Sequence, residues 1–152
     1  MKITLCSSAS FYKQVCEIKK QLQTIGFEVL IPHTANQMEA SGDYRVETYK
    51  TWFADPKHFD KKTSLMQRHL AEVDAGDVVL VVNLTKNSMA GYIGGNVLLE
   101  MFYGWLKKKP IYCLYPISQE LPLYEEVMGF SPICLNGDWA TLANLMQSKN
   151  SN

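Results

Sequence analysis

The run Asp77–Asn83, with the sequence DVVLVVN, constrains the fold of this chain more than any other segment. Its five central residues are apolar, and all but Leu80 are β-branched valines. Such a run is typical of a strand that is buried on both faces of a parallel sheet. We therefore expect it to be the central strand, with Asp77 in a structural role at its amino end and Asn83 at its carboxyl end.

Shorter apolar or alternating segments on either side of this run predict four more strands and the helices between them. The expected strands are Lys2–Cys6, Phe27–Pro32, Pro110–Tyr115 and Pro132–Leu135, and the expected helices are 11–24, 63–74, the segment after Gly91, 119–128 and 139–148. Strands that alternate with helices predict a three-layer α/β domain. The expected architecture is a doubly wound, flavodoxin-like or Rossmann-like parallel sheet of five strands in the order 2-1-3-4-5. Residues 1–148 form its single domain, and 149–152 form a frayed tail.

Residues 34–62 form a long, polar connection after the second expected strand. It carries several aromatic residues, among them Tyr44 and Trp52, and Ala54-Asp55-Pro56 predicts a break between two helical pieces. A connection of this kind either forms a lid or wall of a pocket or covers the edge of the core. In the first case, Tyr44 or Trp52 is placed to stack on a ligand.

Charge and cysteine content exclude several classes of function. The 15 basic and 15 acidic residues balance, so we expect neither a nucleic-acid polymer nor a membrane as partner. The N-terminus lacks a cleavage pattern, and no apolar run is long enough to span a bilayer, which predicts a cytoplasmic protein. The four cysteines have no CxxC spacing and are interpreted as reduced core thiols. With His33 and His58 lacking partners at ligand spacing, we predict no metal and no cofactor.

In the expected strand order, ligands bind in the crevice between the first and third strands, at their carboxyl ends. Hydroxyls, free backbone amides and a helix N-terminus gather there, a set that suits a phosphate or carboxylate. A purely structural strand-to-helix turn is the alternative. The candidate binding residues are Ser7, Ser8 and Ser10 after the first strand, and Asn83, Ser88, Tyr92, Gly94, Gly95 and Asn96 after the third.

Glu100 is the only charged residue between Lys86 and Lys107, in the segment GYIGGNVLLEMFYG. Because a surface helix normally alternates apolar and charged positions, this helix is expected to be buried on most sides. A carboxylate in such surroundings needs donors or a proton, and it is either a satisfied buried acid or a reactive one. The Tyr92 hydroxyl or a loop amide is the expected donor that keeps it ionised.

The segment from Asp77 to Leu114, with DVVLVVN, GYIGGNVLLEMFYG and KKKPIYCL, resembles the nucleoside 2-deoxyribosyltransferase-like superfamily. This group includes the 2′-deoxynucleoside 5′-phosphate N-hydrolases. The resemblance implies that Glu100 attacks the anomeric carbon of a nucleoside or nucleoside monophosphate, and that Ser8 and Ser10 belong to a sugar or phosphate loop. Water as acceptor gives hydrolysis, and a second base gives transfer.

The resemblance also exposes a difference on the helix that precedes the third strand. The superfamily places an aspartate there, which handles the proton of the departing base, and the matching position here falls at or beside His69. A histidine can donate a proton near neutral pH, so His69 is a candidate general acid. A satisfied core histidine is an equally good interpretation from the sequence.

Three other functions remain open from the sequence. His69 in place of the aspartate favours a non-catalytic nucleotide or nucleotide-sugar binding protein on the same fold. A phosphoribohydrolase of the lysine-decarboxylase-like kind has a similar glycine loop but opens it with Pro-Gly-Gly, which this chain lacks. Phe102, Tyr103 and Trp105 could form a dimer face, and superfamily members are commonly oligomeric, so a homo-oligomer, a dimer or larger, is expected.

Overall fold

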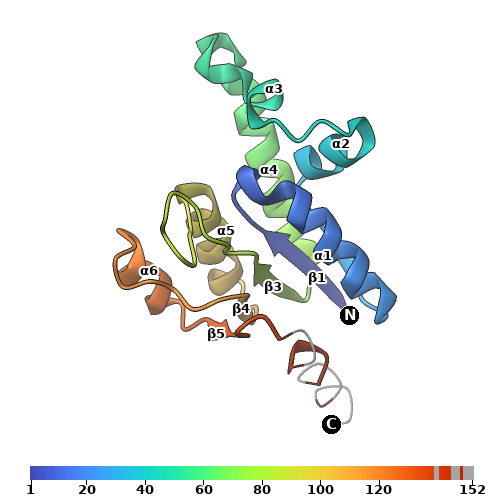
Figure 1. Ribbon diagram of the computed structural model, residues 1–152, viewed down its shortest axis with the longest axis vertical. Helices are drawn as coiled ribbons and strands as arrows, with labels where there is room; N and C mark the ends of the chain where they lie inside the picture. The colour runs from blue at the N-terminus through green and yellow to red at the C-terminus, as the bar shows by residue number, and fades with distance from the viewer. Residues whose placement is uncertain (139–140, 145–147, 149–152) are drawn as a thin grey trace.

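A parallel sheet of five strands forms the centre of the molecule in a computed structural model that describes residues 1–138, 141–144 and 148 (Figure 1). The strands are β1 (Lys2–Cys6), β2 (Glu28–Leu30), β3 (Val78–Val81), β4 (Ile111–Cys113) and β5 (Ile133–Cys134). Their order is β2-β1-β3-β4-β5, and every pair is parallel. The predicted fold class and strand order are confirmed, with β3 as the central strand.

Helices cover both faces of the sheet (Figure 1). As a result, β1 and β3 are buried on both sides. On one face, Ile3, Leu5 and Leu80 pack with residues of α1 (Tyr12–Thr24) and α2 (His33–Ser41). On the other face, Cys6 and Val79 pack with α4 (Phe59–Ala75), α5 (Gly95–Leu106) and α6 (Tyr124–Gly129). The result is the three-layer arrangement expected for uninterrupted β-branched strands.

Several boundaries differ from the sequence-based expectation, although the elements themselves are present. A 3₁₀ turn, η1 (Ala9–Phe11), precedes α1, and α4 begins at Phe59, four residues before the predicted start. Residues 34–62 contain α2, α3 (Val46–Tyr49), η2 (Thr51–Phe53) and η3 (Pro56–His58). The predicted break at Asp55-Pro56 is the start of η3, where the Asp55 carboxylate accepts the N–H of Lys57. This capping bond stabilises the start of η3, after η2 has ended at Phe53.

The expectation that α5 is buried on most sides is wrong. Val97, Met101 and Gly104 face the sheet, whereas Leu99 and Trp105 are 46% and 48% exposed. On that outer face, Phe102 and Trp105 form an aromatic cluster with Phe130, the C-cap residue of α6 (Tyr124–Gly129). The apolar composition of α5 therefore reflects two different surfaces, the sheet on one side and an exposed apolar face on the other.

In the glycine-containing loop before α5, the backbone conformation requires a glycine at Gly91. Its φ is +63°, and an added Cβ would overlap the backbone carbonyl oxygen of Pro116. We expect Gly91→Ala to lower the free energy of unfolding by roughly 2 kcal/mol or more, measured by urea denaturation. Gly95→Ala is the matched control, because a Cβ there meets nothing within 4 Å. Equal stability of the two variants would contradict this assignment.

The sequence predicts a C-terminal helix at 139–148. Of these residues, the structure describes 141–144 and 148, and all five are helical. Leu142 packs into the core on the side of α1. The rest of that prediction, and the predicted frayed tail at 149–152, lie outside the described residues. No helix in the described part of the chain combines the length and hydropathy needed to cross a bilayer.

Candidate functional site

Glu100 lies on the second turn of α5, the helix that starts where the glycine loop ends. Gly94 is the N-cap residue and Gly95 the first helical residue. The Glu100 side chain is only 15% exposed, and its Oε2 is buried without a hydrogen-bond partner. Buried carboxylate oxygens are nearly always hydrogen-bonded, so this one is exceptional.

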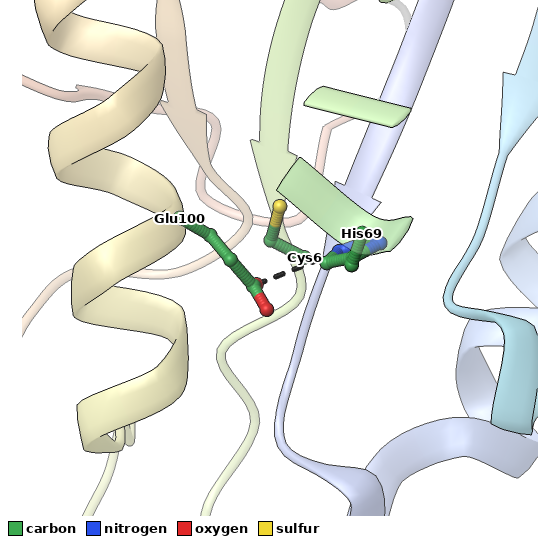
Figure 2. Close-up of side chains that lie close together, drawn as sticks. All are labelled: Cys6, His69 and Glu100. Carbon is green, nitrogen blue, oxygen red and sulfur yellow. Dashed lines mark ion pairs between the residues drawn. The ribbon is translucent and has the colours of Figure 1, made fainter. Parts of the chain in front are cut away.

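His69 faces Glu100 from α4, the neighbouring helix on the same side of the sheet. The separation between His69 Nε2 and Glu100 Oε2 is 3.5 Å, and Figure 2 shows the two groups pointing toward one another. This distance is that of an ion pair, but the atoms do not meet hydrogen-bond geometry, and Nε2 is also buried without a partner. On its other side, the His69 Nδ1–H donates to Glu72 Oε2 at 2.6 Å. The hydrogen bond to Glu72 therefore fixes the orientation of the ring, with its Nε2 facing Glu100.

Cys6 completes the cluster from the last residue of β1. It is fully buried, and its Sγ, the His69 ring nitrogen and a Glu100 oxygen lie within 4.8 Å of one another (Figure 2). The sequence separates the three residues widely, and the β1–β3 pairing together with the packing of α4 on α5 brings them together. The set contains one thiol, one imidazole and one carboxylate, which are common ligands of transition metals.

The electrostatics of the cluster reflect its burial. Burial alone would lower the pKa of His69, but the nearby Glu100 carboxylate and Cys6 raise it well above its ordinary value. Burial, with a further contribution from Glu100, raises the pKa of the Cys6 thiol to about 12. Near neutral pH, His69 is therefore a cation beside Glu100, and Cys6 is a neutral thiol.

A cavity lies directly above this cluster. Its enclosed volume is small, about 60 Å³, and it opens to the surface. Its wall comes largely from residues 33–66, including Tyr49 and Trp52, while Tyr44 packs against the core. Both interpretations of this aromatic segment therefore hold, each for different residues. Its other lining residues include Tyr12, Lys50, Lys62, His69, Asn96 and Glu100.

Two lysines, Lys50 and Lys62, line the cavity. Burial lowers the pKa of both side chains, and each is lowered further by another lysine, Lys86 for Lys50 and Lys50 for Lys62. Neither lysine has an ion-pair partner among the described residues. Glu100 acts in the opposite direction on the pKa of Lys62. Two half-buried cations without an ion-pair partner make the cavity suited to an anion.

The three serines of the turn after β1 do not line the cavity. The Ser7 hydroxyl donates to the backbone oxygen of Val82 at 2.8 Å, which ties the ends of β1 and β3 together. Ser8 accepts a hydrogen bond from Lys86 Nζ at 3.3 Å, and Ser10 is exposed. The cavity-lining residue of this turn is Ala9.

Asn96 is the one candidate binding residue from the glycine loop that lines the cavity. Both polar atoms of the Asn83 side chain bond the backbone of Tyr115, which links β3 to the chain after β4. Ser88 occupies a turn with φ of +63°, and the Tyr92 ring packs under Lys86 Nζ. Among the described residues, neither the Tyr92 hydroxyl nor a loop amide donates to the buried Glu100 Oε2, and His69 is the group beside the carboxylate.

Sequence reasoning missed four residues of this site: Cys6, Glu72, Lys50 and Lys62. Glu72 carries a detectable signal, because a residue three positions after His69 on a helix lies on the same face. Cys6 ends β1 at the carboxyl edge of the sheet, but a cysteine in an apolar strand is also typical of the core and gives no separate signal. The two lysines carry none, because their placement depends on how residues 33–66 fold over the sheet. His58 lies away from the cluster, and its Nδ1 forms a hydrogen bond with the Thr51 hydroxyl.

Comparison with known proteins gives one structural likeness. A solved structure of a 2-deoxyribosyltransferase from the psychrotolerant bacterium Bacillus psychrosaccharolyticus is 20% identical, with a TM-score of 0.56 over 93% of this chain and 96% of that chain. The two chains share a fold. No family model and no curated protein matches this chain. At this identity the likeness supports the architecture, and the chemistry must be argued from the site itself.

Proposed function

We propose that the protein cleaves the N-glycosidic bond of a nucleoside or nucleotide, with Glu100 as the nucleophile. The observation that carries this proposal is a carboxylate at a cavity floor whose buried oxygen has no hydrogen-bond partner and faces the imidazole of His69. Carboxylates at anomeric carbons form covalent glycosyl intermediates through oxocarbenium-like states. The shared fold with a 2-deoxyribosyltransferase supports this reaction class.

The proposed reaction has two steps. A Glu100 oxygen bonds to the anomeric carbon as the bond from that carbon to the base nitrogen breaks, and the bonding electrons leave with the base. His69, held as a cation beside Glu100, donates a proton to the departing base. In the second step, water or a second base bonds to the anomeric carbon as the ester bond to Glu100 breaks, and its proton passes to the neutral His69, which gives hydrolysis or transfer.

Aromatic and polar side chains around the cavity suit the parts of such a substrate. Trp52 lines the cavity with Lys62 Nζ 5.7 Å from its ring centroid, so it stacks on a base only where the base displaces that lysine or meets another part of the ring. Asn96, one turn before Glu100, is placed to bond a sugar hydroxyl.

The test is a panel of purified nucleosides and nucleoside 5′-monophosphates incubated with the protein and a metal chelator. Chromatographic detection of free base supports hydrolysis, and base exchange on adding a second base supports transfer. Thermal stabilisation by a nucleotide without any base release would instead support a non-catalytic binding protein.

The lysines predict which members of the panel react best. We expect the 5′-monophosphates to bind more tightly than the nucleosides, because Lys50 and Lys62 line the cavity and have no ion-pair partner in the described chain. Lys62→Gln should raise KM about ten-fold for the monophosphate and leave the nucleoside nearly unaffected. Lys61→Gln is the matched control, since Lys61 is exposed on the same helix. An equal effect on both substrates would rule out phosphate recognition by Lys62.

A further inference from the structure

The cluster of Cys6, His69 and Glu100 contains a group that catalysis by Glu100 and His69 does not use, the buried Cys6 thiol. Both His69 Nε2 and Glu100 Oε2 are buried without a hydrogen-bond partner. Leaving such atoms unsatisfied is costly, unless something else binds there. The Cys6 thiol beside them takes no part in the proposed reaction.

Distances in the cluster suit a tetrahedral metal ion. Zinc binds imidazole nitrogen and carboxylate oxygen at about 2.0 to 2.2 Å, so two such ligands lie about 3.4 Å apart at a tetrahedral angle. The separation of His69 Nε2 and Glu100 Oε2 is 3.5 Å. Cys6 Sγ lies within 4.8 Å of both, so a small side-chain adjustment brings the sulfur to its own bonding distance.

The surroundings of His69 also resemble those of a metal ligand. Its Nδ1–H donates to the Glu72 carboxylate at 2.6 Å, which leaves Nε2 directed at Glu100 and Cys6. Ligating histidines almost always donate their other ring N–H to a carboxylate, a carbonyl or a water, and this fixes the ring and its tautomer. The cavity above the cluster provides the fourth position, where a water molecule can bind.

We propose that Cys6, His69 and Glu100 bind a thiophilic divalent cation of the zinc class, and that this ion and the nucleoside exclude one another. A thiolate ligand selects zinc-class ions over magnesium or calcium. Binding displaces the protons of the Cys6 thiol and of the His69 Nε2. An ion bonded to Glu100 removes the nucleophile, so the bound metal switches the site off. The binding part stands alone, and the exclusion part rests on the proposed function.

This proposal departs from the sequence-based prediction of no metal. That prediction depended on spacing, and the three ligands lie 63 and 31 residues apart along the chain, at positions 6, 69 and 100. Metal motifs that can be found by spacing come from one turn, hairpin or helix. Here the ligands come from β1, α4 and α5, and only the folded chain brings them together.

The direct test uses Co²⁺ as a spectroscopic probe on chelator-treated protein. We expect one equivalent to give a cobalt–thiolate charge-transfer absorption that Zn²⁺ abolishes by displacement. Cys6→Ser should remove this absorption and weaken binding at least ten-fold. Cys134→Ser is the matched control because this thiol is free and exposed on β5, and its absorption should match the wild type. Absence of the band in the wild type, or its persistence in Cys6→Ser, overturns the proposal.

A second measurement avoids the variants, in case Cys6→Ser does not fold. X-ray absorption at the zinc edge of the loaded wild type should show one sulfur at about 2.3 Å and the remaining scatterers at about 2.0 to 2.2 Å. A shell of nitrogen and oxygen alone overturns the proposed ligand set.

Exclusion is tested separately, by base release at increasing nucleoside concentration with Zn²⁺ present. We expect competitive inhibition, and inhibition unaffected by nucleoside concentration overturns this part. If no nucleoside is cleaved under chelation while the cobalt band appears, the metal site stands and the proposed function fails. Base release without any cobalt band supports the proposed function and overturns the metal site.

Discussion

Glu100→Gln is expected to lower the rate of base release by about 10³-fold or more, because an amide cannot form the glycosyl ester. The replacement keeps the shape of the side chain and its contact with His69, so the fold should be retained. Base release is measured by chromatography in the presence of a chelator, and unfolding is followed by circular dichroism. Glu125→Gln, an exposed acid on α6, is the matched control and should keep full activity.

Trapping the covalent intermediate tests directly whether Glu100 is the nucleophile. Wild-type protein mixed with substrate and quenched in acid should carry the mass of one glycosyl group on the peptide containing Glu100. The Glu100→Gln variant should carry none. Full activity in the variant, or labelling of a different residue, would remove Glu100 as the nucleophile. Loss of activity without any labelled wild-type peptide would favour direct attack by water, with Glu100 as a base.

The topology of this chain could be predicted because its strands carry unambiguous patterns. Val78–Val81 is apolar throughout and buried on both faces, and Lys2–Cys6 has the predicted bounds. The helix at 95–106 was also predicted, but its burial was not. Composition cannot distinguish an apolar face that packs on the sheet from one that is exposed, such as the face carrying Phe102 and Trp105. Whether a second copy of the chain covers that face remains a prediction.

Of the candidate site, the sequence predicts the two central side chains, Glu100 and His69, and little of the cavity around them. Glu100 and His69 were identified separately, and the packing of α4 on α5 places them 3.5 Å apart. The role of the polar residues at the strand ends is harder to predict from the sequence. Hydroxyl and amide groups at the edge of a sheet can form hydrogen bonds either with a ligand or with the backbone. Ser7 and Asn83 bond backbone groups of neighbouring segments. The cavity walls depend on residues 33–66, whose irregular elements have no periodic signal.

His69→Gln is expected to lower the rate of base release about 10²- to 10⁴-fold, the usual contribution of a positioned general acid. His69 is faced by Glu72 on its own helix, Glu100 on α5, Cys6 on β1 and Tyr12 on α1. Because its pKa is raised well above 6.5, the donating form is present below that raised value and is lost as the pH rises through it. Wild-type activity should therefore persist through neutral pH and fall at alkaline pH. The variant should lack this alkaline fall.

A substrate that needs no proton distinguishes an acid from a merely structural histidine. A deoxyriboside whose leaving group departs as a stable anion should react at nearly the same rate with His69→Gln as with the wild type. Glu72→Gln should act through His69, with a smaller loss on natural bases and an alkaline fall moved to lower pH, because the ring loses the carboxylate that favours its charged form. If His69→Gln reacts slowly with both kinds of substrate, the histidine positions Glu100 and does not donate the proton.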